Sequence, residues 1–533
     1  GAGKDKKKAE SKEKKPVAID FDDIHRRVRR VSLPGTKERN LFWSHDSTKL
    51  LFTAQVDGKG GTYSISPAES LKPTLLSTRT GAQAKWIAPG NQIVWLSGKV
   101  PGSMSSSGST KSYKFSVVQE VDRSKRNKAA FDLCWRTMRD FYYDEAYNNR
   151  NWDEIRRKYA VAADQSLTLD ELSTIVNMML GELNGSHLGF MTWDRIPHRF
   201  RTPGMPPSRT SNQPPETTAH LGVRFDSAYR GPGLKVRDVL KGGPADKRKS
   251  KILAGEIILS IDDHNVDPAM DLTELVNGPL ARDFRLKVRD AKGNDRDVVL
   301  RPIDYEAARD LLYEGWVHRT RKQVDKLSGG KFGYLHIRVM EMDCFYRFER
   351  ELYAAGAGKD GLVIDVRENP GGFIADHLLT MLTQPAHAVT VNRGGQPGYP
   401  QDRMVYATWH KPIVVLCNQN SFSNAEIFSH AIKTLKRGKL VGVQTGGCVI
   451  STGATTVMDL GMLRMPFRGW FVLGDGQDME LNGAMPDYVV WAKPCEMPSG
   501  IDHQLTKAVE VLKEEVAVEK KRPRPRLLKA SER

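Results

Sequence analysis

The chain has 533 residues, of which 39% are hydrophobic and 27% are charged, a composition typical of a soluble globular protein with several domains. No run of eighteen apolar residues occurs, which argues against a membrane-spanning helix. The net charge of +17 suggests nucleic-acid binding, but much of it lies near the two ends, and no zinc-finger spacing, P-loop or aromatic ribonucleoprotein motif is present.

Residues 1–16 are rich in lysine and contain no apolar stretch, so we expect a disordered basic lead-in and not a signal peptide. The five cysteines are far apart and show neither metal-ligand spacing nor a disulfide framework, which favours a reducing compartment. We therefore expect a cytoplasmic protein, an expectation that a signal sequence upstream of residue 1 would change.

Strand and turn patterns characterise residues 17–125. The stretch 40–65 alternates apolar and polar residues around two turns, and 84–98 repeats the pattern more weakly. Within residues 40–65, "FWSHDSTKLLF" resembles the "WSPDGKxLLF" phrase of β-propeller blades. A blade takes about 40–45 residues, so the segment supplies about two blades and cannot close a ring.

Helical patterns dominate residues 126–200, beginning with a predicted helix over 131–147. Thr168 and Glu171 have the spacing of a capping box. The apolar residues that follow share one helix face: Leu172, Ile175, Val176, Met179, Leu180 and Leu183. Asn184–Gly185 is expected to end this helix, which places the next two residues, a Ser-His pair, in a turn.

A proline-rich linker at 201–217 precedes a compact module at 218–305. The phrases "HLGVRF" and "GGPADK…ILAGEIILSIDDHNV" resemble those of PDZ domains. The resemblance implies that a peptide adds as a strand, with its terminal carboxylate held by the loop that contains Leu221, Gly222 and Val223. A PDZ-shaped spacer with a blocked groove is the alternative.

Apolar strands alternate with helices over residues 306–515, before a basic tail at 516–533. The near-continuous apolar runs indicate an α/β layer with a buried, largely parallel sheet. The expected strands are FGYLHIRV, GLVIDVR, PIVVLCN, KLVGVQT and MPDYVVW.

Ser423, in "NQNSFSNAEIF", is the candidate nucleophile. It follows an apolar strand and precedes a predicted helix over 424–437, whose free N–H groups and positive dipole end would suit a developing oxyanion. Serine is also a preferred N-cap, and this stretch alone favours that interpretation. His430 lies seven residues along the same helix, about 10 Å away, which is too far for a general base.

Four phrases, in order along the chain, decide between these interpretations. "GELNGSHLGF", "GLVIDVRENPGGFIAD", "NQNSFSNAEIF" and "MELNGAMPDYVV" resemble motifs of the tricorn group within the tail-specific serine peptidases. The resemblance covers nearly all of residues 17–500. It implies a ClpP/crotonase-like α/β catalytic core with a helical cap, an inserted PDZ-like domain, and a partial β-propeller-like segment at the N-terminal end.

The resemblance also implies catalytic roles by position. Ser423 would be the nucleophile and His187 the general base. Ser186 would orient the imidazole, and Glu480 would lie behind it as the acid that stabilises the imidazolium. Without the resemblance, His187 would be taken for a hydrogen-bonded turn histidine.

The implied oxyanion hole consists of the N–H groups of Gly372 and Asn424, with Gly371 as the neighbouring alternative. Pro370 replaces a common glycine of the family, and Asn424 stands where an aspartate often follows the serine. The other branch of the superfamily activates its serine with a lysine. Cys448 occupies the corresponding position here, which argues against a Ser/Lys dyad.

We therefore expect a serine endopeptidase or carboxypeptidase-like enzyme that hydrolyses peptides or unfolded polypeptides through an acyl-enzyme, without metal or organic cofactor. The family implies a homo-oligomer, as a ring or cage. Two alternatives remain: a peptide-binding scaffold in which the PDZ-like groove acts and the serine site is silent, and a basic nucleic-acid-associated protein.

Overall fold

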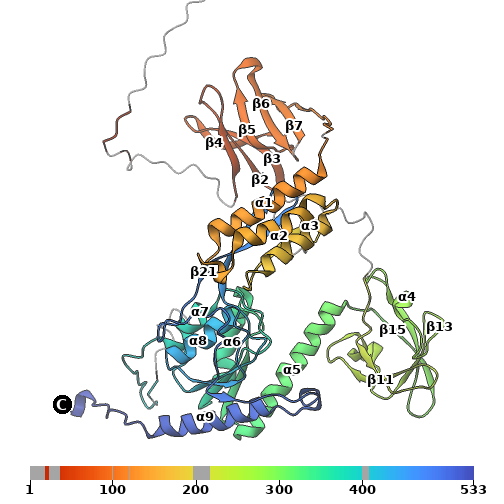
Figure 1. Ribbon diagram of the computed structural model, residues 1–533, viewed down its shortest axis with the longest axis vertical. Coiled ribbons are helices and arrows are strands. Elements are labelled where there is room, and N and C mark those ends of the chain that lie inside the picture. The colour runs from red at the N-terminus through yellow and green to blue at the C-terminus, as the bar shows by residue number, and fades with distance from the viewer. Residues whose placement is uncertain are drawn as a thin grey trace, which may run out of the picture. The chain divides into compact units, whose positions relative to one another are not determined.

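A computed structural model describes residues 19–22, 24, 36–98, 100–118, 120–195, 217–395, 397–398 and 407–532. The expected lead-in at 1–16 and the linker residues 201–216 lie outside this part. The chain divides into two compact units, Gly1–Val121 and Asp122–Arg533 (Figure 1). No helix within the described residues is long and apolar enough to cross a bilayer.

The first unit contains two four-stranded antiparallel sheets, each a simple meander. The strands of the first sheet are β1 (Arg39–Trp43), β2 (Leu50–Val56), β3 (Lys59–Ser66) and β4 (Ser70–Ser77). Those of the second are β5 (Ala82–Ile87), β6 (Gln92–Ser97), β7 (Val100–Ser105) and β8 (Thr110–Ser112). Leu51 of the first sheet packs with Ile93, Trp95 and Met104 of the second, so one apolar core joins them. The relation of these sheets to propeller blades stays a prediction.

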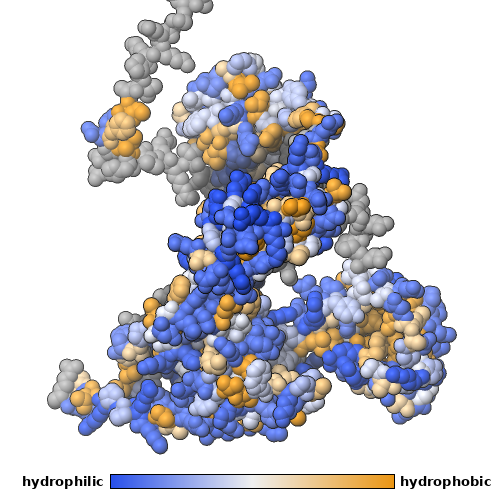
Figure 2. Space-filling model, viewed as in Figure 1, coloured by the Kyte–Doolittle hydropathy of each residue, from blue (hydrophilic) through white to orange (hydrophobic). Residues whose placement is uncertain are grey.

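Three helices open the second unit: α1 (Arg123–Phe141), α2 (Trp152–Gln165) and α3 (Leu169–Gly181). The predicted capping box of Thr168 and Glu171 is confirmed at the start of α3. The predicted limits of the first helix were wrong, because α1 begins at Arg123 with a polar first turn and ends at Phe141. The apolar faces of these helices form a shared core, and the side they present in Figure 2 is mostly hydrophilic.

Residues 218–303 form a separate small sheet with its own apolar core. Its strand order is β10-β11-β12-β14-β15, with β13 paired to β12. The elements are β10 (Val223–Phe225), β11 (Leu234–Val239), β12 (Ile257–Ile261), β13 (His264–Asn265), α4 (Thr273–Val276), β14 (Phe284–Arg289) and β15 (Asp295–Leu300). Helix α4 is a single short turn.

The predicted buried parallel sheet is confirmed. It has the order β16-β17-β18-β19-β22, and every pairing is parallel. Its strands are β16 (Phe332–His336), β17 (Gly361–Asp365), β18 (Ile413–Cys417), β19 (Lys439–Gly442) and β22 (Tyr488–Val489). One core joins it to α6 (Met342–Gly356), α7 (Ala375–Thr383) and α8 (Asn424–Thr434), and another to α5 (Tyr305–Ser328) and α9 (His503–Lys521). The sheet is therefore a layer between two sets of helices. Because α9 continues to Lys521, the predicted basic tail begins inside a helix.

A three-stranded sheet connects the helices of residues 123–181 with the α/β core. Strands β20 (Ile450–Val457) and β21 (Gly461–Gly469) form a hairpin, and β21 pairs with β9 (Gly189–Thr192), which follows α3. Sequence patterns did not reveal this pairing. The pairing of β9 with β21 fixes the start of β9 against the core, and so it positions Ser186 and His187, which lie just before β9.

Candidate active site

Four side chains from distant parts of the chain form one series of hydrogen bonds. Ser423 Oγ lies 3.0 Å from His187 Nε2, and His187 Nδ1 lies 2.6 Å from Ser186 Oγ. The Ser186 hydroxyl donates to Glu480 Oε2 at 2.9 Å, and the Ser186 N–H donates to Oε1 at 2.6 Å. The structure thus brings together all four residues to which the family resemblance assigned catalytic roles.

Ser423 lies between β18 and α8, in the N-cap position of the helix. Its φ of 54° and ψ of −116° fall in a region that serine rarely adopts, so the turn is strained. The N–H of Ser423 donates to Glu426 Oε1 at 3.0 Å, which helps to hold the turn. The side chain contacts His187, so its position at the helix start is compatible with a role beyond capping.

Glu426 organises the loop around Ser423, a role that the sequence motif did not reveal. The carboxylate is completely buried and accepts hydrogen bonds from the Ser423, Gly447 and Cys448 N–H groups and from the Thr445 hydroxyl. Burial raises the pKa of Glu426, and these four donors oppose the rise. One carboxylate therefore ties the serine turn to residues 445–448.

His187 is 8% exposed, and its ring stacks on Phe422 with 5.0 Å between centroids. Burial, with a smaller contribution from Arg464, lowers the pKa of His187 to about 4. The imidazole is therefore neutral at neutral pH. Because the Ser186 hydroxyl donates to Glu480, it accepts from His187 Nδ1–H, which leaves Nε2 free to accept the Ser423 proton.

Glu480 is 4% exposed and also accepts the Val449 N–H at 2.8 Å. Burial raises its pKa, while the hydrogen bonds from Ser186 and Val449 favour the ionised form. Asp478 accepts the Glu480 N–H and the Tyr143 hydroxyl, each at 3.0 Å. Asp478 and Tyr143 belong to no recognisable motif, and the sequence did not predict that they support the site.

Two backbone donors adjoin the serine. Within the described part of the chain, the N–H groups of Gly372 and Asn424 have no hydrogen-bond acceptor. A Cβ on Gly371 would lie 2.7 Å from Ser423 Cβ, which places this glycine turn directly against the nucleophile. The Gly371 N–H already donates to Asn369 Oδ1 at 2.9 Å, so Gly371 contributes no free donor to an oxyanion hole.

The turn needs glycine at both positions. Gly371 and Gly372 have φ values of 91° and 143°, and a Cβ on Gly372 would lie 2.1 Å from the Met340 carbonyl oxygen. The Asn424 side chain accepts the Ala375 N–H at 2.8 Å. Its side-chain oxygen is therefore engaged in the fold, and its backbone N–H remains for a ligand.

Other nearby groups have structural partners. Ser421 donates to the Val366 carbonyl, Ser429 donates to the Ala425 carbonyl, and His430 Nε2 lies 3.1 Å from the Asn482 carbonyl oxygen. Burial raises the pKa of the Cys448 thiol to about 11, with Glu426 and Glu480 contributing. No cluster that could hold a metal ion occurs among the described residues.

In the candidate peptide-binding loop at 221–223, one backbone N–H group already has an acceptor. The Gly222 N–H donates to His220 Nδ1 at 3.0 Å, while Leu221 and Val223 are buried in the core of the small sheet. Gly222 therefore offers no free donor to a terminal carboxylate. Peptide binding at this loop stays a prediction.

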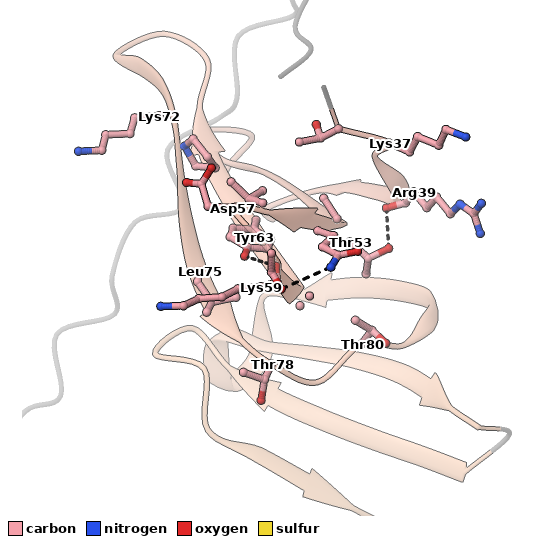
Figure 3. A pocket seen from close by; sticks show the side chains of 18 residues that line it. Lys37, Arg39, Thr53, Asp57, Lys59, Tyr63, Lys72, Leu75, Thr78 and Thr80 are labelled. Carbon is pink, nitrogen blue, oxygen red and sulfur yellow. Dashed lines mark hydrogen bonds between the residues drawn. The ribbon is translucent and has the colours of Figure 1, made fainter. Parts of the chain in front are cut away.

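An open hollow of about 1470 Å³ lies on the β1–β4 sheet of the first unit (Figure 3). Its charged lining residues are Lys37, Arg39, Asp57, Lys59 and Lys72, so cations outnumber acids. The sequence predicted no site here. None of the four hydrogen-bonded residues around Ser423 belongs to this unit.

Two protein-family models match parts of the second unit. Residues 331–490 match the model of peptidase family S41, and residues 124–181 match that of the tricorn protease C1 domain. The chain contains an S41 peptidase domain and a tricorn C1 domain. The S41 domain includes Ser423, Gly372, Asn424 and Glu480, while the C1 domain covers α1–α3 and ends shortly before His187.

The chain is also similar to curated proteases of two kinds. The chain is 29% identical over 413 residues to tricorn protease homolog 1 of Streptomyces coelicolor, which covers 74% of this chain and 36% of that protein. It is 25% identical over 406 residues to the carboxyl-terminal-processing protease of Synechocystis, which covers 72% and 86%. The chain thus spans about a third of the length of its Streptomyces relative.

A solved structure supports the architecture. A tricorn protease crystal structure superposes with a TM-score of 0.70 at 21% identity, covering 90% of this chain and 47% of that one. The S41-containing unit therefore has a mixed α/β fold shared with part of tricorn protease.

Proposed function

We propose that the chain is a serine peptidase that hydrolyses peptides or unfolded polypeptides through an acyl-enzyme. The observation that carries the proposal is the hydrogen-bonded series Glu480–Ser186–His187–Ser423. Its members have the donor and acceptor order that nucleophilic catalysis by serine requires. The S41 and tricorn C1 domains support the same reaction class.

In the first half-reaction, Ser423 Oγ attacks the scissile carbonyl carbon while His187 Nε2 takes the hydroxyl proton. The imidazolium is stabilised through Ser186 by the negative charge of Glu480. The negative oxygen of the tetrahedral intermediate is held by the N–H groups of Gly372 and Asn424. His187 then gives its proton to the leaving amine, and the carbon–nitrogen bond breaks to leave an ester on Ser423.

In the second half-reaction, His187 takes a proton from water, and the resulting hydroxide equivalent attacks the ester carbonyl. The tetrahedral intermediate uses the same two N–H donors. His187 returns the proton to Ser423 Oγ as the ester bond breaks. The products are a free carboxylate and the regenerated enzyme.

The test of this proposal is a pre-steady-state measurement with a chromogenic peptide ester. Rapid acylation followed by slower hydrolysis would release a burst of leaving group stoichiometric with the enzyme. Digestion of an unfolded protein, analysed by mass spectrometry, would accompany it. The absence of both a burst and peptide products would contradict the proposal.

Replacing Glu480 with glutamine is expected to lower kcat/KM by about 10³- to 10⁴-fold. The amide removes the negative charge that stabilises the imidazolium, and its NH₂ group would face N–H or O–H donors at Ser186 and Val449. The measurement is peptide turnover, with the melting temperature as the check on folding. Glu514→Gln, on the exposed side of α9, is the matched control. An undiminished rate in Glu480→Gln would remove Glu480 from the mechanism.

The pH dependence of kcat/KM is expected to have an acid limb below pH 6.5, the ordinary pKa of histidine. Catalysis needs neutral His187 and ionised Glu480. Burial lowers the pKa of His187 to about 4, so the imidazole stays neutral well below pH 6.5. Burial also raises the pKa of Glu480 above its ordinary value, so protonation of this carboxylate contributes to the same acid limb. Turnover between about pH 4 and pH 9 measures the limb. An acid midpoint at or above 6.5 would contradict this account.

The wider context of the enzyme is also a proposal. A PDZ-like module at 218–305 would bind part of the polypeptide substrate, and a ring or cage of identical chains in the cytoplasm would follow from the family resemblance. Peptide binding without turnover would indicate the scaffold alternative. Salt-sensitive binding of nucleic acid that requires the basic ends of the chain would indicate a nucleic-acid-associated protein.

A further inference from the structure

Arg464 is a charged residue in β21 that neither the sequence motifs nor the proposed mechanism uses. It is paired with Gly189 of β9 on one side and with Ala454 of β20 on the other. The preceding residue, Leu463, is buried in the core of the helices, so Arg464 points to the opposite face of the strand. Its two cross-strand neighbours have no side chain or a small one, which leaves room beside the guanidinium.

Within the described part of the chain, the Arg464 guanidinium has no fixed partner. The residue is half-buried, and among the described residues it makes no ion pair and no side-chain hydrogen bond. Burial lowers the pKa of Arg464, as expected for a cation without a neighbouring carboxylate. A ligand carboxylate at this position would compensate for the lost hydration of the charge.

The two buried carboxylates near Ser423 already accept hydrogen bonds from other groups. Glu480 accepts hydrogen bonds from Ser186 and Val449. Glu426 accepts four hydrogen bonds from the serine turn and from residues 445–448. Neither carboxylate is paired with Arg464.

Arg464 belongs to the histidine side of the site. Its partner Gly189 follows His187 by two residues, and the positive charge of Arg464 contributes to the lowered pKa of His187. In the proposed mechanism His187 protonates the leaving amine, so the substrate residues beyond the scissile bond lie on this side. The N–H groups of Gly372 and Asn424 instead donate to the oxygen of the scissile carbonyl.

We infer that Arg464 forms a subsite for a substrate carboxylate on the leaving-group side of the scissile bond. This inference rests on the proposed peptidase function and specifies its substrate class. The carboxylate has two sources: an acidic side chain just after the cut, or the free C-terminus of a substrate that ends close to it. Either one would form a charge-assisted pair with the guanidinium.

The test uses two pairs of fluorogenic peptides. One pair differs only in Glu or Gln after the cut, and the other only in a free or an amidated C-terminus. We would measure kcat/KM with the unmodified enzyme and with Arg464→Met, and equilibrium binding of the same peptides with Ser423→Ala and with Ser423→Ala/Arg464→Met. Arg468→Met, an exposed position on the same strand, is the matched control.

The charged member of at least one pair is expected to be favoured about tenfold in kcat/KM and in affinity. Arg464→Met should reduce this ratio to about one, whereas Arg468→Met should leave it unchanged. A preference confined to the first pair identifies an acidic side chain, and one confined to the second identifies the C-terminal carboxylate.

Equal values within both pairs for the unmodified protein would overturn the inference. An equal loss of rate for both members in Arg464→Met, with the ratio retained, would also overturn it, because Arg464 would then act only through the pKa of His187. If no peptide is turned over but the carboxylate preference in binding is present and depends on Arg464, the proposed function fails and the subsite stands.

Discussion

Replacing Ser423 with alanine is expected to lower kcat/KM for every peptide substrate by roughly 10⁴- to 10⁶-fold while the chain stays folded. The change removes the Oγ that would form the acyl-enzyme and leaves His187 Nε2 without its 3.0 Å partner. The Glu426 hydrogen bond to the backbone of the serine turn is unaffected by the substitution. We therefore expect the melting temperature to change little, and the loss to fall on turnover alone.

The matched control for this prediction is Ser429→Ala. Ser429 lies in the same helix, and its hydroxyl donates only to the Ala425 carbonyl. Its removal should leave turnover within about threefold of the unmodified enzyme. Comparable activity in Ser423→Ala and Ser429→Ala would show that another group is the nucleophile.

Replacing His187 with alanine is expected to have an effect almost as large, because residues that act as one catalytic unit lose nearly the whole of their contribution together. Without the imidazole, no base lies within hydrogen-bond reach of Ser423 Oγ among the described side chains. Ser186 and Glu480 would keep their mutual hydrogen bonds but lose the group that they stabilise. Turnover by the double variant Ser423→Ala/His187→Ala should match that of the single variants.

His430→Ala is the informative comparison for the base. His430 lies seven residues after Ser423 on α8, and its Nε2 lies 3.1 Å from the Asn482 carbonyl oxygen. This variant should retain turnover within about tenfold, since a structural hydrogen bond is worth roughly 1 kcal/mol. A rate in His187→Ala equal to that of the unmodified enzyme would refute the assignment of the base.

Local sequence patterns predicted the parts of the fold that local interactions determine. The buried parallel strands are continuous apolar runs, and the start of α3 has the Thr168–Glu171 capping box. The helix after Ser423 was also expected, although α8 ends at Thr434, three residues before the predicted end. Each of these elements is specified by residues within a few positions of one another.

The contacts that complete the site depend on pairing between distant segments. His187 and Ser423 are 236 positions apart, and they meet because β9 pairs with β21 of a hairpin that no pattern revealed. The role of Glu426 is set by backbone donors from another loop, the N–H groups of Gly447 and Cys448. Asp478 is held by the Tyr143 hydroxyl, which comes from a distant segment. A single sequence gives no measure of such contacts, so only the family resemblance linked the imidazole to the serine.

The sequence also could not predict where a helix with a polar first turn begins, or which backbone N–H groups already have an acceptor. The start of α1 at Arg123 is fixed by Asp122, whose side chain caps the helix before the apolar pattern begins. The N–H groups of Gly371 and Gly222 are taken by Asn369 and His220, neighbours two residues away. Glycine motifs indicate where backbone comes close to a ligand, but not which donors remain free.

Labelling with a fluorophosphonate followed by peptide mapping tests the nucleophilic activation of Ser423 most directly. The reagent reacts with a serine only where a base and oxyanion donors activate the hydroxyl. We predict one adduct per chain, located on Ser423, under conditions in which Ser421 and Ser429 remain unmodified. An unmodified Ser423 in folded protein, or an adduct on a different residue, would contradict the account.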